Sequence, residues 1–138
     1  MSSASDERKP VKMILVGFDR SQILERRFKA AGYDVLTVRD GMAAIDHARR
    51  EPWDAAVLVS TGSLVNVADT AFNLRDLNRS MEIIILVNRL GPRSNRFLRP
   101  LLEHPIERTR VLTRRQLQRE LTTRTHNRAV REKIVSLG

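Results

Sequence analysis

The stretch Lys12–Val59, "KMILVGFDRSQILERRFKAAGYDVLTVRDGMAAIDHARREPWDAAVLV", decides the fold. It contains two short apolar segments, Lys12–Phe18 and Asp34–Val38, and nearly all of a third, Asp54–Ser60. Near-continuous apolar runs of this length are typical of strands that are covered on both faces. Because each pair of segments is separated by enough residues for a helix, the stretch predicts parallel strands joined by right-handed helical crossovers.

The two segments between these strands have the apolar spacing of helices. In the first, Gly32 marks the helix end, and either Ser21 or Asp19 would cap its start. Its apolar positions are Ile23, Leu24, Phe28 and Ala31. The second helix, Met42–Trp53, follows an Asp-Gly turn and is closed by Pro52. One of its faces carries Ala44, Ile45 and Ala48.

The second half of the chain continues the alternation. Ala68–Ser80 fits a helix less regularly, and Met81–Asn88 is the strongest strand because β-branched isoleucines fit a pleated surface. A loop and a short helix interrupted by Pro100 precede a weaker strand at Arg108–Thr113, and a long helical stretch ends the chain. The order predicts one doubly wound α/β domain with a five-stranded parallel sheet. Its strands are expected near 12–18, 34–38, 54–60, 82–88 and 109–113.

Composition limits the kinds of site that are possible. Of the 138 residues, 41% are hydrophobic and 30% charged, which suits one compact domain. The chain has no cysteine and only three scattered histidines, so we expect no disulfide bond, no metal site and no cofactor. Residues 1–11 are polar and predict a disordered leader without a signal peptide. No apolar run approaches the ~20 residues that span a bilayer, so we expect a cytoplasmic protein without membrane contact.

The positive charge is concentrated in the C-terminal third. Residues 1–88 carry 12 basic and 12 acidic side chains and are neutral. Residues 89–138 carry 13 basic and 4 acidic side chains, an excess of nine that equals the net charge of the whole chain. Twelve of those 13 cations are arginine, which binds carboxylate and phosphate groups in a bidentate manner. The distribution favours an acidic partner or nucleic acid.

Residues 30–48, "AAGYDVLTVRDGMAAIDHA", carry a family resemblance. They resemble the receiver domains of bacterial two-component response regulators, in which a helix, a glycine and an apolar strand similarly lead into a helix that starts Gly-x-Ala-Ala. The resemblance extends over roughly residues 12–125. It implies a flavodoxin-like (βα)5 fold with strand order 2-1-3-4-5. We therefore expect a receiver-like domain at residues 12–121 and a basic C-terminal helical extension at residues 122–138.

The phosphoryl chemistry of that family uses an acidic pair after the first strand and an acceptor aspartate at the end of the third. The acidic pair is matched here by Phe18 and Asp19, so one carboxylate survives, and Asp19 could equally be a helix cap. The acceptor is matched by Val59, or by Ser60 if the register shifts by one. Since a valine cannot accept a phosphoryl group and one carboxylate is a poor magnesium site, the resemblance is to a pseudo-receiver.

Two further positions of the family's site also differ. The Ser/Thr that follows the fourth strand in the family is matched by Val87 or Asn88. The lysine that follows the fifth strand is matched by Arg114, and Arg115 stands where the family usually has a proline. These departures imply that the usual phosphorylation switch does not operate.

The resemblance and the charge together favour a non-enzymatic signalling module that binds a protein partner. The family's usual signalling face is made by the fourth helix, the fifth strand and the fifth helix. Here it would carry Arg93, Arg96, Arg99, Arg108, Arg110, Arg114, Arg115 and Arg119. We expect this face to bind an acidic protein surface. The alternative is a nucleic-acid-binding regulator that uses the same basic third, although an aromatic content of 4% offers few stacking platforms.

The C-terminal stretch is longer than the last helix of a receiver requires. Leu117 and Leu121 continue the stripe that packs on the sheet, and the polar segment "TTRTHNR" follows at residues 122–128. A second apolar group then consists of Ala129, Val130, Ile134 and Val135. We expect this group to be buried in a homodimer; a different protein partner or a frayed tail are the other possibilities.

Overall fold

The computed structural model describes residues 10–17, 21–59, 67–87, 98–101 and 103–123. Its five strands form one parallel sheet in the order β2-β1-β3-β4-β5. The strands are β1 (Val11–Val16), β2 (Tyr33–Val38), β3 (Ala55–Val59), β4 (Glu82–Val87) and β5 (Thr109–Thr113). The predicted flavodoxin-like sheet and its strand order are confirmed.

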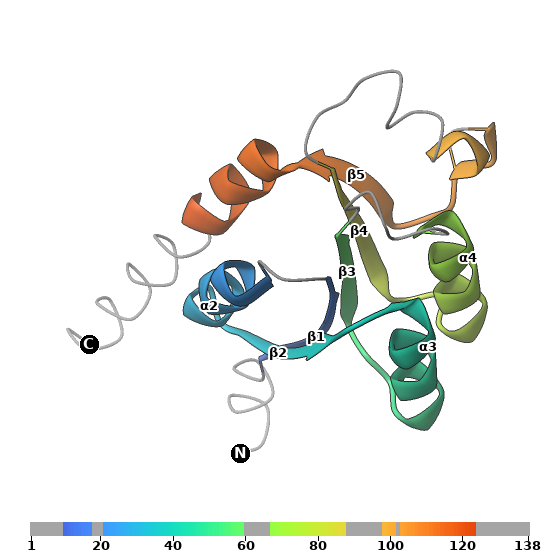
Figure 1. The fold of residues 1–138 in the computed structure, drawn as a ribbon, viewed down its shortest axis with the longest axis horizontal. Coiled ribbons are helices and arrows are strands. Elements are labelled where there is room, and N and C mark those ends of the chain that lie inside the picture. Colours follow the sequence, from blue (N-terminus) through green and yellow to red (C-terminus); the bar gives the residue numbers. More distant parts are fainter. Residues whose placement is uncertain (1–9, 18–20, 60–66, 88–97, 102, 124–138) are drawn as a thin grey trace, which may run out of the picture.

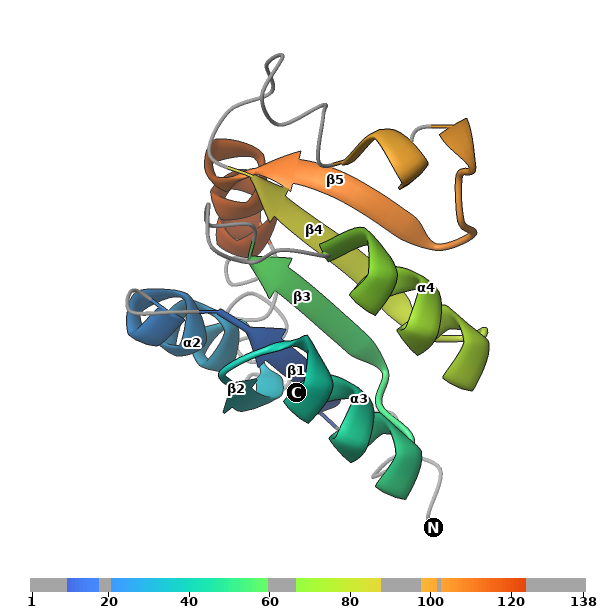
Figure 2. The same ribbon diagram turned by 45° about the vertical axis from the view of Figure 1, so that its right-hand side comes forward.

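Helices cover both faces of the sheet (Figures 1 and 2). On one face lie α2 (Ser21–Ala30) and a last helix at residues 114–123. On the other lie α3 (Gly41–Arg50), α4 (Val67–Leu77) and a short helical segment at residues 98–101. Within the described ranges, no helix has the length and apolar composition that crossing a membrane requires.

The side chains of the central strands divide between two apolar cores. Ala55, Val57 and Val59 of β3 belong to the core under α2 and helix 114–123. Ala56 and Leu58 belong to the core under α3 and α4. All five side chains are buried because both faces of the sheet are covered, which is why this strand is a continuous apolar run rather than an alternating one.

The apolar positions of α2 are not all buried. Leu24 and Phe28 are buried, at 5% and 1% exposure, but Ile23 is 58% exposed. Leu24 and Phe28 are four residues apart and set the buried stripe, whereas Ile23 lies about 100° around the helix from Leu24. Gly32 ends the helix as predicted, with a φ of 98° that glycine adopts without steric cost.

The Asp40–Gly41 pair starts a helix directly. The Asp40 carboxylate accepts a hydrogen bond from the Ala43 N–H at 2.9 Å and caps α3. A Cβ at Gly41 would collide with the side chain of Thr70 in α4. The close approach of α3 to α4 therefore requires a glycine at this position.

Trp53 is a core residue, as predicted, with 6% exposure. Its Nε1 donates a hydrogen bond to the His47 carbonyl at 3.3 Å, and the Lys12 ammonium lies 4.6 Å from the centre of its ring. The helix before it is shorter than predicted, because α3 ends at Arg50 rather than at Trp53.

The start of the sheet also differs from the prediction. Val11 was assigned to a disordered leader, but it is the first residue of β1 and pairs with Tyr33 of β2. The strand ends at Val16 instead of Phe18. The remainder of the predicted leader, residues 1–9, lies outside the described residues.

Candidate functional site

Ligands of open α/β sheets bind at the carboxyl ends of the strands. Here β3 ends at Val59, β4 at Val87 and β5 at Thr113. Strand pairing places Val59 beside Leu86 and Val87 beside Thr113. The positions matched to the acceptor and hydroxyl of the receiver site are thus brought to the same edge of the sheet. The other matched positions there, Phe18, Asp19, Ser60 and Asn88, lie outside the described residues.

Val59 and Val87 are packing residues. They are 3% and 2% exposed. Val59 belongs to the core that includes Leu24 and Leu117, and Val87 belongs to the opposite core with Leu98. Neither side chain has an atom that can act as a nucleophile, a metal ligand or a hydrogen-bond donor. A polar group introduced at either position would have to be buried.

Metal-binding side chains do not gather in the described part of the chain. Within those ranges, no group of three or more histidine, aspartate and glutamate residues could hold a metal ion. The carboxylate of the matched acidic pair, Asp19, lies in a segment outside those ranges.

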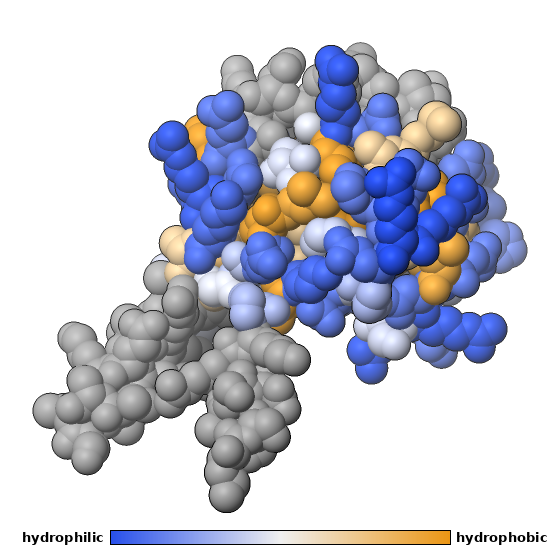
Figure 3. Space-filling model, turned by 90° about the horizontal axis from the view of Figure 1, so that it is seen from below, coloured by the Kyte–Doolittle hydropathy of each residue, from blue (hydrophilic) through white to orange (hydrophobic). Residues whose placement is uncertain are grey.

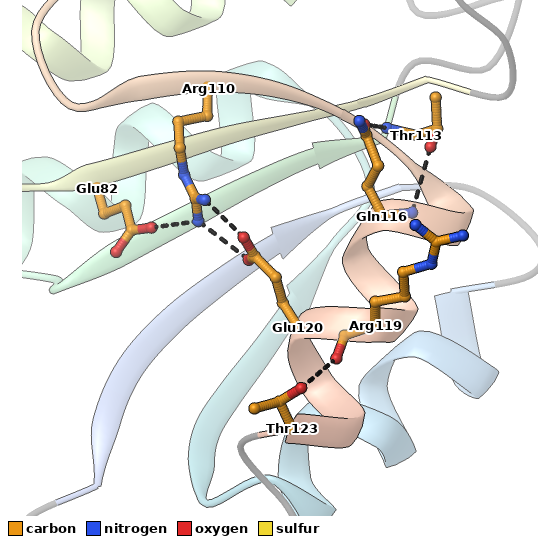
Figure 4. A network of polar contacts seen from close by, with 7 residues as sticks. All are labelled: Glu82, Arg110, Thr113, Gln116, Arg119, Glu120 and Thr123. Atoms are coloured by element: carbon orange, nitrogen blue, oxygen red, sulfur yellow. Dashed lines mark hydrogen bonds and ion pairs between the residues drawn. The ribbon is translucent and has the colours of Figure 1, made fainter.

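Thr113 joins the end of β5 to the last helix. Its Oγ1 accepts a hydrogen bond from the Gln116 N–H at 3.2 Å, and its own N–H donates to Gln116 Oε1 at 2.9 Å (Figure 4). This reciprocal pair is a capping box, so the helix begins without a loop. Arg114, matched to the family's lysine, is the first residue of that helix. Its Nε atom is buried and has no hydrogen-bond partner in the described part of the chain.

Arg110 is the centre of an ion-pair cluster that joins β4, β5 and the last helix. Its guanidinium lies 2.9 Å from Glu82 and 2.7 Å from Glu120 (Figure 4). Hydrogen bonding to Glu120 is the largest cause that raises the pKa of Arg110 above its ordinary value. Glu82 lies within reach because Ile84, two residues along β4, stands directly opposite Arg110. Arg110, which was predicted to bind a partner, is thus held in ion pairs with two carboxylates of the domain.

Two other arginines of the predicted partner face also have partners inside the domain. Arg99 Nε donates to Glu103 at 3.0 Å, one helical turn away. Arg108 Nη1 donates to the Ser80 carbonyl at 3.2 Å, from a residue whose φ is 55°. Arg93 and Arg96 lie outside the described residues.

Exposed arginines remain on the helices of the other sheet face. Arg115 and Arg119 are exposed, and within the described chain their guanidinium groups have no ion-pair partner. Figure 4 shows no contact between the Arg119 guanidinium and the other labelled side chains. Arg26 and Arg27 of α2 are also exposed and lack an ion-pair partner in the same ranges. Helix 114–123 and α2 cover the same face of the sheet, so these four charges share one side of the molecule.

Arg75 was not identified from the sequence. Its Nη1 donates to the carbonyls of Asn78 at 3.0 Å and Met81 at 2.7 Å, and its Nη2 donates to Thr109 Oγ1 at 3.3 Å. Burial, followed by the charge of Arg108, lowers the pKa of Arg75. The side chain ties the turn after α4 to the start of β5. A basic residue in the last turn of a helix commonly binds exposed carbonyls, and that signal could have found it.

The C-terminal predictions are tested only in part. Leu117 and Leu121 pack on the sheet as predicted, with 1% and 5% exposure. The predicted self-association residues Ala129, Val130, Ile134 and Val135 lie outside the described residues.

Comparisons with known proteins find likeness in structure rather than in sequence. No protein-family model matches the chain, and no curated protein matches it significantly. The receiver domain of the sensor histidine kinase PA1611 from Pseudomonas aeruginosa is 22% identical, with a TM-score of 0.62, over 85% of this chain and 98% of that one. Chemotaxis protein CheY4 of Vibrio cholerae is 18% identical, with a TM-score of 0.64, over 83% and 98%.

A putative response regulator from Chloroflexus aurantiacus is 19% identical, with a TM-score of 0.66, over 86% of this chain and 97% of that one. Each of these proteins is matched over nearly its whole length. Together with the strand order 2-1-3-4-5 and the helices on both faces, the likeness shows that this chain has the fold of the response-regulator receiver domains.

Proposed function

We propose that the chain is a receiver-like signalling module that acts by binding a protein partner and does not depend on phosphorylation. Receiver domains are generally non-enzymatic signalling modules. The observation that carries the proposal is the burial of Val59 and Val87 at the positions matched to the acceptor and the hydroxyl. A hydrocarbon side chain cannot form an acyl phosphate.

The matched positions also lack ligands for a magnesium ion. The receiver domain of PA1611 carries a magnesium ion coordinated in its active-site cleft. In this chain, valine stands at two of the matched positions and Phe18 at a third, which leaves the single carboxylate of Asp19. Because Mg²⁺ prefers an octahedral set of oxygen ligands, we expect no tight magnesium site.

Small phosphodonors test this part of the proposal. Incubation of the full chain with acetyl phosphate should leave its mass unchanged, and beryllofluoride with magnesium should leave its ¹H–¹⁵N spectrum unchanged. A receiver domain that retains the acceptor aspartate, treated in parallel, serves as the reagent control. A stoichiometric acyl phosphate on any residue of this chain would contradict the proposal.

The partner site that the described geometry favours is the exposed face of helix 114–123 together with α2. Arg115 and Arg119 lack acidic partners in the described ranges, and Arg26 and Arg27 lie on the other helix of this face. Arg110, in contrast, is neutralised by two carboxylates. Unpaired guanidinium groups on one face favour an acidic protein surface, which they would also attract during encounter.

Charge reversal tests the site. The double variant Arg115→Glu/Arg119→Glu and the wild-type chain are used as baits in extracts of the native host. Arg79→Glu, which reverses an exposed charge after α4, is the matched control. We expect a partner that binds the wild type and the control but not the double variant, with no effect of nuclease. Nuclease-sensitive capture that weakens steeply with salt would favour the nucleic-acid alternative, and equal capture by all three baits would refute this site.

The C-terminal apolar group is a second proposed contact. Ala129, Val130, Ile134 and Val135 would pack against the partner or against another copy of the chain. The full-length variant Ile134→Glu tests this contact, because a charge at its centre should reduce either partner capture or self-association. If neither changes, the group has no role in association.

A further inference from the structure

Hydrophobic surface is exposed on the outer side of α3. Met42, in the first turn of α3, is 82% exposed, more than any other large hydrophobic side chain in the described ranges. A hollow of about 370 Å³ adjoins it, lined by Met42, Ala43, Ile45, Asp46 and Arg49. Seen from below Figure 1, where β2 and α3 lie, hydrophobic surface runs between flanks of hydrophilic side chains (Figure 3).

The neighbouring strand is an edge of the sheet. Among the described strands, β2 pairs with β1 alone. An edge strand offers a row of backbone groups with which another chain can pair. Leu36 of β2 is partly buried against the same core as Ala43 and Ile45 of α3, so the strand and the helix adjoin one another.

This surface carries both signs of charge. Asp46 and Arg49 lie four and seven residues after Met42 and therefore share its side of the helix. Arg49 is exposed and has no ion-pair partner in the described part of the chain. Asp46 is paired with Arg50 at 3.3 Å, and the two side chains are 61% and 70% exposed. Such an exposed pair contributes little and can be exchanged for another partner.

The charge pattern indicates which partner fits. A surface of one sign selects a partner of the opposite sign, as proposed for Arg115 and Arg119. A surface with an apolar centre and both an acid and a base is complementary to itself, because a two-fold axis places the acid of one copy opposite the base of the other and repeats the contact in reverse. The patch formed by Met42, Asp46 and Arg49 has this composition.

We propose that the outer face of α3 and the adjoining edge of β2 bind a second copy of this chain in a two-fold symmetric dimer. Met42 of each copy enters the hollow on the other, and Asp46 of each copy lies opposite Arg49 of the other. The contact does not depend on the proposed partner site, because α3 lies on the opposite face of the sheet from α2 and helix 114–123. Since the patch is small, the dimer is a weak one at the low end of interface size.

Sedimentation of the full chain from about 10 to about 500 μM measures this association. We expect dimer to form with increasing concentration. Met42→Glu places a charge in the apolar centre and should raise the dissociation constant at least ~10-fold. Ile23→Glu places the same charge on an exposed hydrophobic residue of α2 and should leave the constant unchanged. Far-ultraviolet circular dichroism of each variant shows that it is folded.

A charge swap distinguishes this dimer from any other. Asp46→Arg alone and Arg49→Asp alone each place like charges opposite one another, so each should weaken self-association. An equimolar mixture of the two variants restores opposite charges at both contacts and should associate more tightly than either variant alone. A chain that stays monomeric throughout, an unchanged Met42→Glu variant, or a mixture that shows no rescue would each overturn the proposal.

Discussion

Replacing Val59 by aspartate restores the acidic residue type at the position matched to the phosphate acceptor. Val59 is 3% exposed and belongs to the core under α2 and helix 114–123. The introduced carboxyl group would therefore be buried among hydrocarbon side chains. We expect the substitution to destabilise the domain rather than to create a phosphorylation site.

The magnitude follows from two losses. Burial of a whole valine side chain stabilises a folded protein by ~1.5–3 kcal/mol. A buried polar group without a hydrogen-bond partner costs a further ~1–3 kcal/mol. The variant Val59→Asn, whose uncharged side chain is nearly isosteric with aspartate, should therefore lower the free energy of unfolding by about 2.5–6 kcal/mol. This is a large part of the ~5–15 kcal/mol typical of a domain.

The aspartate variant should in addition depend on pH. Burial disfavours the charged carboxylate, so the pKa of the introduced carboxyl group is raised in the folded state above the ~3.9 of the unfolded chain. Between these two pKa values the folded state holds more protons, and the free energy of unfolding therefore falls as the pH rises. Below about pH 3 the group is largely neutral in both states, and Val59→Asp should match Val59→Asn.

Urea unfolding of the wild type and both variants at several pH values between about 3 and 8 measures these effects. The difference between the aspartate and asparagine variants should be near zero at the acid end and should grow with pH. If Val59→Asp at pH 8 is as stable as the wild type, the side chain has access to water or to a cation. The carboxyl edge of the sheet would then be a polar site, and the reasoning above would be refuted.

Three further substitutions test individual contacts by urea unfolding. Arg75→Lys should lower the free energy of unfolding by about 1–3 kcal/mol. An ammonium group cannot reach the carbonyls of Asn78 and Met81 and the hydroxyl of Thr109 at once. If the variant is as stable as the wild type, those hydrogen bonds are dispensable. Thr113→Val removes the oxygen of the capping box and should lower the free energy of unfolding by ~1 kcal/mol. An unchanged urea midpoint would mean that the last helix does not need this cap. Gly41→Ala should cost about 1–3 kcal/mol through its collision with Thr70, and adding Thr70→Ala should recover part of the loss; the absence of rescue would place the strain elsewhere.

The sheet could be predicted because its strands are encoded locally. β3 and β4 are apolar along almost their whole length, and helical segments separate the strands. The number and the parallel direction of the strands therefore followed from the hydrophobic pattern, and their order in the sheet followed from the family resemblance. Strand ends were less accurate. Val11 pairs with Tyr33 although Pro10 and the polar residues before it suggested a leader that includes Val11. Pairing with β2 is a tertiary contact that the local sequence does not contain.

The contacts of the arginines could not be predicted in the same way. Eight arginines looked equivalent on the predicted face, yet Arg110 is paired with acids that lie 28 residues before it and 10 residues after it. Finding those partners requires the register of β4 against β5 and the rotation of the last helix about its axis. A pattern of charges in the sequence therefore identifies a basic region, but strand register decides which of its charges remain available.

The positions of the two proposed surfaces have a consequence for how the module could work. Val59 and Val87 are buried hydrocarbon side chains, so neither contributes a polar group at the carboxyl edge of the sheet. Communication between surfaces would then have to pass through the packed layers. The basic surface lies on α2 and helix 114–123, and the self-complementary surface on α3 and β2, with the sheet between the two sets of helices. A dimer formed through α3 would leave the arginines of both copies exposed, so each dimer would present two faces that bind acidic surfaces. An acidic partner with repeated sites would bind this dimer more tightly than the monomer, because the second contact forms at a high effective concentration. The module could then respond to its own concentration without a phosphorylation step.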